Sequence, residues 1–257
     1  MIFDTHVHLN DPNFKENYEE LIKEALENNI NKMTVVGYDL ESSKIAIELA
    51  QKYDFIYAAI GLHPAEQFKD YDKDIKQLES MINNKVVAIG EIGLDYHYCP
   101  LDKKRQEDMF VKQLELAKKH NLPIIIHSRD ACNDTYIILK EYKSCYTKGI
   151  MHCYSYSLEM AKEYKKLGFL FGIGGVVTYK NGKTIKEVTQ GISLNDIVLE
   201  TDAPYLAPTP YRGKINVPKY IKEVAKEVSE IKNISIKEVE DITYKNACDF
   251  FGVFYEN

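Results

Sequence analysis

The chain has 257 residues, with 45% hydrophobic side chains, 28% charged side chains and a formal net charge of −6. No apolar run reaches the ~18 residues that a membrane-spanning helix needs, which excludes a transmembrane protein. The negative net charge excludes a protein that binds nucleic acid through the electrostatic attraction of its overall charge.

The start of the chain and its cysteines predict a cytoplasmic protein. The opening MIFDTHVH lacks a basic segment followed by an apolar run, so we expect no signal peptide. The cysteines are odd in number and show no CxxC spacing, which is typical of reduced thiols in the cytoplasm. The composition leaves the oligomeric state open, and a monomer is compatible with it.

Apolar segments rich in β-branched residues recur along the chain and predict strands. Near-continuous apolar strands are typical of a parallel sheet that is buried on both faces. The eight predicted strands cover residues 2–9, 32–38, 55–63, 86–94, 122–128, 149–154, 169–175 and 196–204.

Amphipathic segments lie between the predicted strands, with apolar residues at helical spacing among charged ones. In the first of them, Leu21, Ile22 and Ala25 fall on one stripe. The predicted helices cover residues 16–29, 42–53, 72–83, 102–120, 130–143, 157–167 and 182–190, and then 217–231 and 235–249 after the last strand.

Strands that alternate with helices imply parallel strands joined by crossover connections. Eight such units in a chain of this length predict an α/β fold, a (β/α)8 TIM barrel that residues 1–257 form as a single domain. A doubly wound open sheet is the alternative. It is disfavoured because no Gly-rich dinucleotide loop follows the first predicted strand.

Five of the seven histidines fall at the carboxyl ends of predicted strands, where TIM barrels carry their active groups. In FDTHVHLN, the alternation of a strand puts His6 and His8 on the same face. One such histidine is more often a hydrogen-bonded core residue, but several at the same end of different strands indicate a metal site. The polar residues at these ends are His6, His8, His63, Glu91, His127, His152 and Asp202.

The number of potential ligands predicts two divalent ions, because one tetrahedral ion cannot use them all. Imidazole ligands suit Zn²⁺ or Mn²⁺, whereas Mg²⁺ prefers oxygen ligands. Glu91 follows small residues and could bridge the two ions. Strand alternation predicts that Cys153 points away from His152, so we expect no thiolate ligand. The expected groups are His6, His8 and Asp202 for one ion, and His127 and His152 for the other.

Several motifs carry a resemblance to a known enzyme family. In chain order they are DTHVHL, GLHP, GEIGLDY, LPIIIHSRDA, HCYS, GGVVTYKN and LETDAPYLAP, and the likeness continues to NACDFFG near the end. The chain thereby resembles the TatD family of metal-dependent hydrolases, a TIM-barrel branch of the amidohydrolase superfamily whose characterised members are deoxyribonucleases. The metal ligands that the resemblance implies are His6, His8, Glu91, His127, His152 and Asp202.

We expect hydrolysis by a water molecule that two divalent ions, zinc, manganese or magnesium, activate. Asp202 and Glu91 are the predicted catalytic residues, and Asp202 would orient the water and take its proton. The resemblance predicts a DNA substrate, single-stranded or at 3′ ends, and 3′–5′ exonuclease activity. An ester, lactone or amide hydrolase with the same two-metal site is the alternative, and a non-catalytic barrel is a third.

Three cationic residues near the strand ends are candidates for substrate phosphate contacts. Arg129 follows the fifth strand and should point inward, although it could instead pair with Asp130 or Glu200. Arg212 and Lys214, in PYRGKIN after the last strand, could bind phosphate. Glu200 shares a face with the end of the last strand and is expected to support a metal ligand rather than to be one.

The resemblance implies that His63 lies in the pocket, where it would contact substrate or support the site. A hydrogen-bonded turn histidine before Pro64 is the alternative. Two departures from the family pattern lie in substrate loops: Ile215 and Val217 replace a base and an acid, and Tyr156 replaces a glycine. Tyrosines near the strand ends could stack on bases, although packing is the ordinary role of most. They are Tyr96, Tyr154, Tyr156, Tyr179 and Tyr205.

Overall fold

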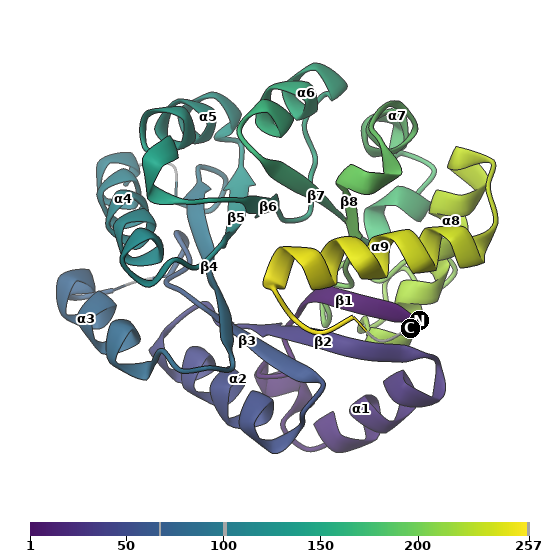
Figure 1. The fold of residues 1–257 in the computed structure, drawn as a ribbon, viewed down its shortest axis with the longest axis horizontal. Helices are drawn as coiled ribbons and strands as arrows, with labels where there is room; N and C mark the ends of the chain where they lie inside the picture. The colour runs from purple at the N-terminus through teal and green to yellow at the C-terminus, as the bar shows by residue number, and fades with distance from the viewer. Residues whose placement is uncertain (67, 100–101, 256–257) are drawn as a thin grey trace.

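The computed structural model describes residues 1–66, 68–99 and 102–255. Its eight strands are parallel and follow one another around the sheet in chain order (Figure 1). The predicted TIM barrel is confirmed. The strands are β1 (Ile2–Val7), β2 (Ile30–Val36), β3 (Ile56–Ile60), β4 (Val86–Asp95), β5 (Ile124–Arg129), β6 (Gly149–Met151), β7 (Phe169–Ile173) and β8 (Ile197–Leu199).

Helices between the strands form an outer ring around the barrel (Figure 1). Each predicted helix is present, with ends that differ by a few residues from the prediction. The helices are α1 (Tyr18–Glu27), α2 (Leu40–Lys52), α3 (Tyr71–Met81), α4 (Lys103–His120), α5 (Cys132–Glu141), α6 (Leu158–Lys166), α7 (Lys183–Gly191), α8 (Ile221–Lys232) and α9 (Ile236–Phe251).

Most strands are shorter than the sequence predicts, and β6 and β8, with three residues each, are the shortest. β6 ends at Met151 and β8 at Leu199. Soon after these ends, Cys153 and Asp202 adopt φ angles of 42° and 57°, in the left-handed region that interrupts a strand. Asp202 and His152 therefore lie on the loops just past the strands.

The barrel closes where the chain after β8 meets β1. The backbone N–H of Asp202 donates to the carbonyl of His6 at 2.9 Å. The fully buried Asp4 accepts hydrogen bonds from the backbone and the hydroxyl of Thr201, at 2.9 and 2.6 Å. Burial raises the pKa of Asp4 to about 7. These bonds hold the first and last of the predicted ligand segments side by side.

The interior of the barrel packs against α9. Phe3, Val87 and Ile125 from the strands form one apolar cluster with Tyr244 and Phe251 of the helix. Figure 1 shows α9 lying across the barrel, near the point where β1 begins. Because α9 covers the amino end of the strands, the carboxyl end is left for functional side chains.

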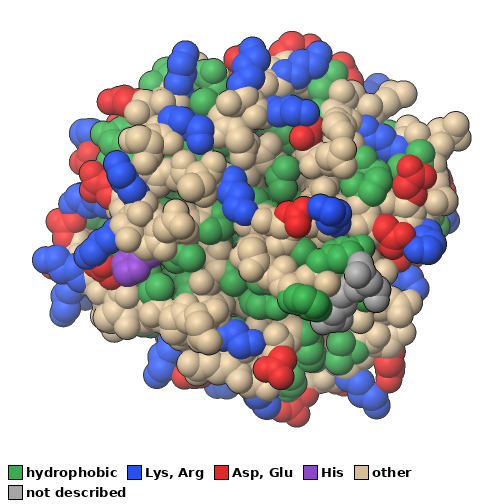
Figure 2. Space-filling view, in the orientation of Figure 1, with side chains coloured by type: hydrophobic (Ala, Val, Ile, Leu, Met, Phe, Trp, Pro, Cys, Tyr) green, Lys and Arg blue, Asp and Glu red, His purple; other side chains and the backbone are tan. Residues whose placement is uncertain are grey.

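The face that α9 covers carries charges of both signs. Figure 2 shows basic and acidic side chains interspersed over it, with hydrophobic atoms between them. Such a mixture produces no strong field of one sign on this face. Within the described ranges, no helix combines the length and the apolar character that crossing a bilayer requires.

Candidate metal centre

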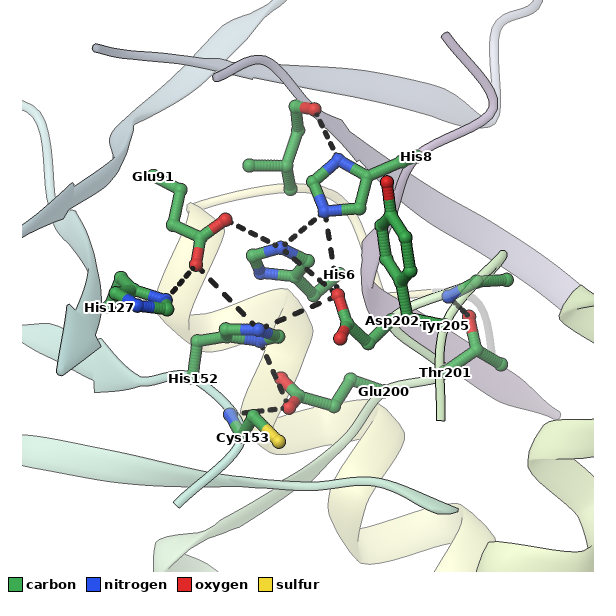
Figure 3. Close-up of polar contacts among 12 residues, drawn as sticks. His6, His8, Glu91, His127, His152, Cys153, Glu200, Thr201, Asp202 and Tyr205 are labelled. Atoms are coloured by element: carbon green, nitrogen blue, oxygen red, sulfur yellow. Dashed lines mark hydrogen bonds and ion pairs between the residues drawn. The ribbon is translucent and has the colours of Figure 1, made fainter. Parts of the chain in front are cut away.

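Side chains from distant strands meet at the carboxyl end of the barrel (Figure 3). His6 of β1 and His8 just after it direct their Nε2 atoms to one point, and these atoms lie 3.2 Å apart. Glu91 of β4 places Oε2 3.4 Å from His6 Nε2. Asp202 places Oδ1 3.4 Å from His8 Nε2. All four residues are buried, so the centre is largely shielded from water.

Two more histidines join this group from different sides. His152 stacks on His6, with ring centroids 3.5 Å apart, and its Nε2 lies 3.6 Å from Asp202 Oδ1. His127 lies beyond Glu91, with Nδ1 2.8 Å from Glu91 Oε1. The sequence analysis assigned His127 and His152 to the same ion. In the structure His152 lies instead with His6 and Asp202. Glu91 lies between the two sides.

The spacing of these atoms fits a bound divalent cation. Two nitrogen ligands of one zinc ion, each about 2.0–2.1 Å from the metal, lie roughly 3–3.4 Å apart. The 3.2 Å between His6 Nε2 and His8 Nε2 matches this separation. Two neutral imidazole lone pairs facing each other at this distance would repel, so a cation between them removes an unfavourable contact. Two groups of side chains that could hold a metal contain His6: one is His6, His8 and Glu91, and the other is His6, His152 and Asp202. A third group is His63, Asp95 and His127.

The contacts of the outer ring nitrogens favour metal binding by the inner ones. His8 Nδ1 lies 2.9 Å from the carbonyl oxygen of Val36. His152 Nδ1 lies 3.0 Å from Glu200 Oε1. Both neighbours are acceptors, so we assign a proton to Nδ1 of each ring, and a bound metal would take the place of a proton on Nε2.

Glu200 is fully buried behind His152, in the supporting position that the sequence predicts. Gly172 makes room for it, because a Cβ there would come 2.2 Å from Glu200 Oε2. The backbone N–H of Cys153 donates to Glu200 Oε1 at 2.6 Å. The prediction that Cys153 points away from this region is wrong: its thiol, His152 and Glu200 lie within 4.8 Å of one another. β6 has already ended, so strand alternation no longer applies.

Asp95, the last residue of β4, is a site residue that the sequence analysis missed. Its Oδ2 lies 2.9 Å from His127 Nε2. Because the carboxylate is an acceptor, we assign the ring proton to Nε2, and Nδ1 is then available to a metal near Glu91. Its Oδ1 accepts the backbone N–H groups of His97 and Tyr98, at 2.9 and 2.8 Å. A signal was available, because Asp95 follows Glu91 by four positions in one strand and should share its face.

We expect Asp95→Ala to weaken metal binding by roughly 10- to 100-fold, because it removes the acceptor that orients His127. Asp95→Asn should keep most of the affinity, since the amide oxygen can still accept the Nε2 proton. Metal titration with bound metal counted by plasma emission measures both variants. Asp54→Ala, at an exposed side chain, is the control. Equal affinities for Asp95→Ala and the wild type would contradict the assignment.

The carboxylates of the centre are held in their ionised form. Burial alone would raise the pKa of Glu91, but the positive charge of nearby His152 and the hydrogen bond from His127 lower it well below its usual value. Burial also opposes ionisation of Asp202, and His152 again outweighs it and lowers the pKa. A bound metal would take the place of the imidazole protons beside these carboxylates, and ionised carboxylates with imidazole lone pairs are the donor set that divalent transition metals bind.

The comparison with known families agrees with this chemistry. The sequence pattern of the family described as TatD related DNase matches residues 3–252. The chain belongs to the TatD family.

Individual relatives show the same relationship over the full length of both chains. YabD of Bacillus subtilis, named an uncharacterized metal-dependent hydrolase, is 43% identical over 254 residues, which cover 98% of this chain and 100% of YabD. YcfH of Escherichia coli, named in the same way, is 31% identical over 256 residues, covering 98% and 96%. The crystal structure of YjjV, a TatD homolog from Escherichia coli, superposes with a TM-score of 0.93 at 32% identity, covering 98% of each chain. This TatD-family chain is therefore a metal-dependent hydrolase.

His63 lies beside the TatD centre as a neutral hydrogen-bond donor. Its Nε2 is 3.8 Å from Glu91 Oε1. Its Nδ1 accepts the backbone N–H of Ala65 at 3.2 Å, so the ring proton is on Nε2. Burial lowers the pKa of His63 to about 3, so the ring stays neutral near pH 7. In this tautomer, His63 offers the pocket an N–H rather than a lone pair.

Arg129 lies at the rim of the TatD pocket instead of pointing inward. It is exposed, and its guanidinium carbon is 4.7 Å from the centre of the Tyr98 ring. Among the described residues, neither Asp130 nor Glu200 forms an ion pair with it, and Asp130 instead lies 3.1 Å from His97 Nδ1. The cation therefore remains available to an anion at the mouth.

Arg212 and Lys214 are also exposed at the mouth, on the loop after β8. The Arg212 guanidinium carbon lies 4.2 Å from the ring centre of Tyr179, and Nη1 donates to Asn181 Oδ1 at 3.4 Å. Stacking on a buried tyrosine limits the motion of this side chain without neutralising its charge. The roles of both cations in substrate binding stay predictions.

Proposed function

We propose that this TatD-family hydrolase is a divalent-metal-dependent phosphodiesterase that cleaves DNA, single-stranded or at 3′ ends, as a 3′–5′ exonuclease. The observation that supports it is the convergence of four imidazoles and two ionised carboxylates below a rim with unneutralised arginines. Both features suit phosphodiester cleavage, because the substrate is anionic and its developing charge is stabilised by nearby cations. We further infer a cytoplasmic protein that acts without a membrane.

Two divalent ions, zinc, manganese or magnesium, would lower the pKa of a bound water and neutralise charge on the reacting phosphoryl group. Glu91 lies between the two groups of imidazoles, which supports a role for it in holding both ions. The residues proposed to hold the ions are His6, His8, Glu91, His127, His152 and Asp202.

The remaining steps fall to side chains of the chain itself. Asp202, ionised and at the centre, would orient the attacking water and accept its proton. The Nε2–H of His63 would donate to a phosphate oxygen as charge develops there. Arg129 and Arg212 would bind neighbouring phosphates, with two parallel N–H groups each, and Lys214 would add a positive charge.

A hydrolase of carboxylic esters, lactones or amides is the second candidate. One observation favours it: Ile215, which replaces a base of the family pattern, is 56% exposed in the same loop as Arg212. An apolar side chain there suits a less charged substrate. The metal centre serves either reaction, since an activated water can attack carbon or phosphorus.

A metal-resolved assay distinguishes the two functions. Single-stranded DNA, double-stranded DNA and a simple carboxylic ester are incubated with wild type and with His127→Ala, after chelation and reloading with one metal at a time. We expect 5′-labelled single-stranded DNA to shorten stepwise from its 3′ end, with little product from His127→Ala. Turnover of the ester without cleavage of either DNA would overturn the phosphodiesterase proposal.

A further inference from the structure

Two exposed tyrosines flank the candidate centre on opposite sides of the barrel mouth. Tyr98 follows β4 and is 65% exposed, and Tyr205 follows β8 and is 51% exposed. β4 and β8 lie across the barrel from each other (Figure 1). Exposed aromatic rings on both sides of the mouth offer flat, apolar faces on which flat groups of a ligand can stack.

Tyr205 is fixed in place although half of its surface is exposed. Its hydroxyl donates to Asp11 Oδ2 at 2.9 Å, and its backbone N–H donates to the carbonyl of Asp202 at 2.8 Å. Its ring lies edge-on to His8, with centroids 6.0 Å apart, as Figure 3 shows beside Asp202. A ring held in this way loses little freedom when a second flat group stacks on it.

Tyr98 adjoins the other side of the centre. Asp95, which contacts His127, accepts the backbone N–H of Tyr98 at 2.8 Å. The Arg129 guanidinium lies over the Tyr98 ring, 4.7 Å from its centre. A second flat group could occupy the exposed surface of the ring while Arg129 reaches a phosphate.

The other tyrosines considered for stacking are less suitable. Tyr96, Tyr154 and Tyr179 are 9% or less exposed, and pack within the protein. The Tyr156 hydroxyl is engaged with Ser128 at 2.9 Å. Tyr205 combines an exposed ring with a contact to the candidate ligand His8, and Tyr98 combines one with a backbone contact to Asp95, the partner of His127.

We propose that Tyr98 and Tyr205 stack on two unpaired bases of single-stranded DNA, one on each side of the phosphodiester bound at the centre. This inference rests on the proposed function and adds the residues that select unpaired strands. In a duplex, each base is already stacked and paired, so its faces are not free for the tyrosines. The two rings therefore favour a single strand without reading its sequence.

Binding of a fluorescein-labelled single-stranded oligonucleotide tests the inference. The probe carries phosphorothioate linkages that slow cleavage, and anisotropy reports its Kd for the metal-loaded protein. We expect Tyr98→Leu and Tyr205→Leu each to weaken binding by roughly 5- to 100-fold. Tyr98→Phe, which keeps the aromatic ring, should bind within about twofold of wild type. Phe254→Leu is the control for the loss of an exposed aromatic ring, because Phe254 is 79% exposed and follows the carboxyl end of α9. This variant should bind the probe like wild type.

An abasic probe separates stacking from a structural effect of the substitutions. With the bases next to the scissile linkage removed, wild type and the leucine variants should bind with equal Kd. If the leucine substitutions weaken the abasic and the complete probe by the same factor, or weaken neither, the stacking inference is wrong.

Hydrolysis of bis(p-nitrophenyl) phosphate by wild type distinguishes failure of this inference from failure of the proposed function. If this small diester is hydrolysed while the probes contradict stacking, only the inference about the tyrosines is overturned. If neither the diester nor DNA is hydrolysed, the phosphodiesterase proposal is overturned, and the inference with it.

Discussion

Replacing Asp202 with asparagine is expected to lower kcat by roughly 10²- to 10⁴-fold in enzyme saturated with metal. The carboxylate is held ionised, and its Oδ1 lies 3.4 Å from His8 Nε2 and 3.6 Å from His152 Nε2. Asparagine has the same shape and can still offer an oxygen, but it cannot take a proton from water. Steady-state kinetics with the bound metal counted in the same sample measures the effect.

Two comparisons make the Asp202 result specific. Asp249→Asn, at an exposed carboxylate on α9, should leave kcat unchanged. Raising the metal concentration until Asp202→Asn is fully loaded tests whether Asp202 only holds metal. Recovery of wild-type kcat under that condition would rule out proton transfer by Asp202.

Replacing Glu91 with glutamine is expected to have the largest effect on metal content. Glu91 lies between the two sides of the centre, with Oε2 3.4 Å from His6 Nε2 and Oε1 2.8 Å from His127 Nδ1. An amide carries no charge and bridges two cations poorly. We expect the variant to lose at least one ion per chain and kcat to fall by more than about 10²-fold.

Glu200→Gln is the matched control for Glu91→Gln. Glu200 is buried like Glu91, but it contacts the Nδ1 side of the His152 ring, which faces away from the centre. Its replacement should weaken metal binding by roughly 10- to 100-fold and leave the stoichiometry intact at saturating metal. If Glu91→Gln binds as much metal as Glu200→Gln and turns over as fast, Glu91 is not a bridge.

The barrel was predictable because its strands are buried on both faces. Such burial produces nearly continuous apolar runs, which are easy to recognise in a sequence. The ends of β6 and β8 were less predictable, since the polar residues after them belong to loops in which Cys153 and Asp202 take left-handed backbone angles. The pattern of apolar and polar residues does not indicate the position at which the backbone stops being extended.

The candidate ligands were predictable for a topological reason. Parallel strands in a barrel all end at the same rim, so histidines at the ends of different strands must approach one another. Asp95 was missed because its importance comes from His127, a residue of the neighbouring strand. The outward direction of Arg129 was also missed, because its stack on Tyr98 joins the end of β5 to the loop after β4.

The sequence by itself determined the fold and the group of side chains that meet at one end of the barrel. Strand and helix periodicity are local properties of the sequence. They specify a barrel whose parallel strands all end at the same rim, so the side chains at these ends lie close together. Only the tertiary structure decided which nitrogen of His8, His127 and His152 faces the centre, and which tyrosines stay exposed beside it. These features depend on contacts such as Asp95 with His127 and Tyr205 with Asp11, which join residues distant in the chain.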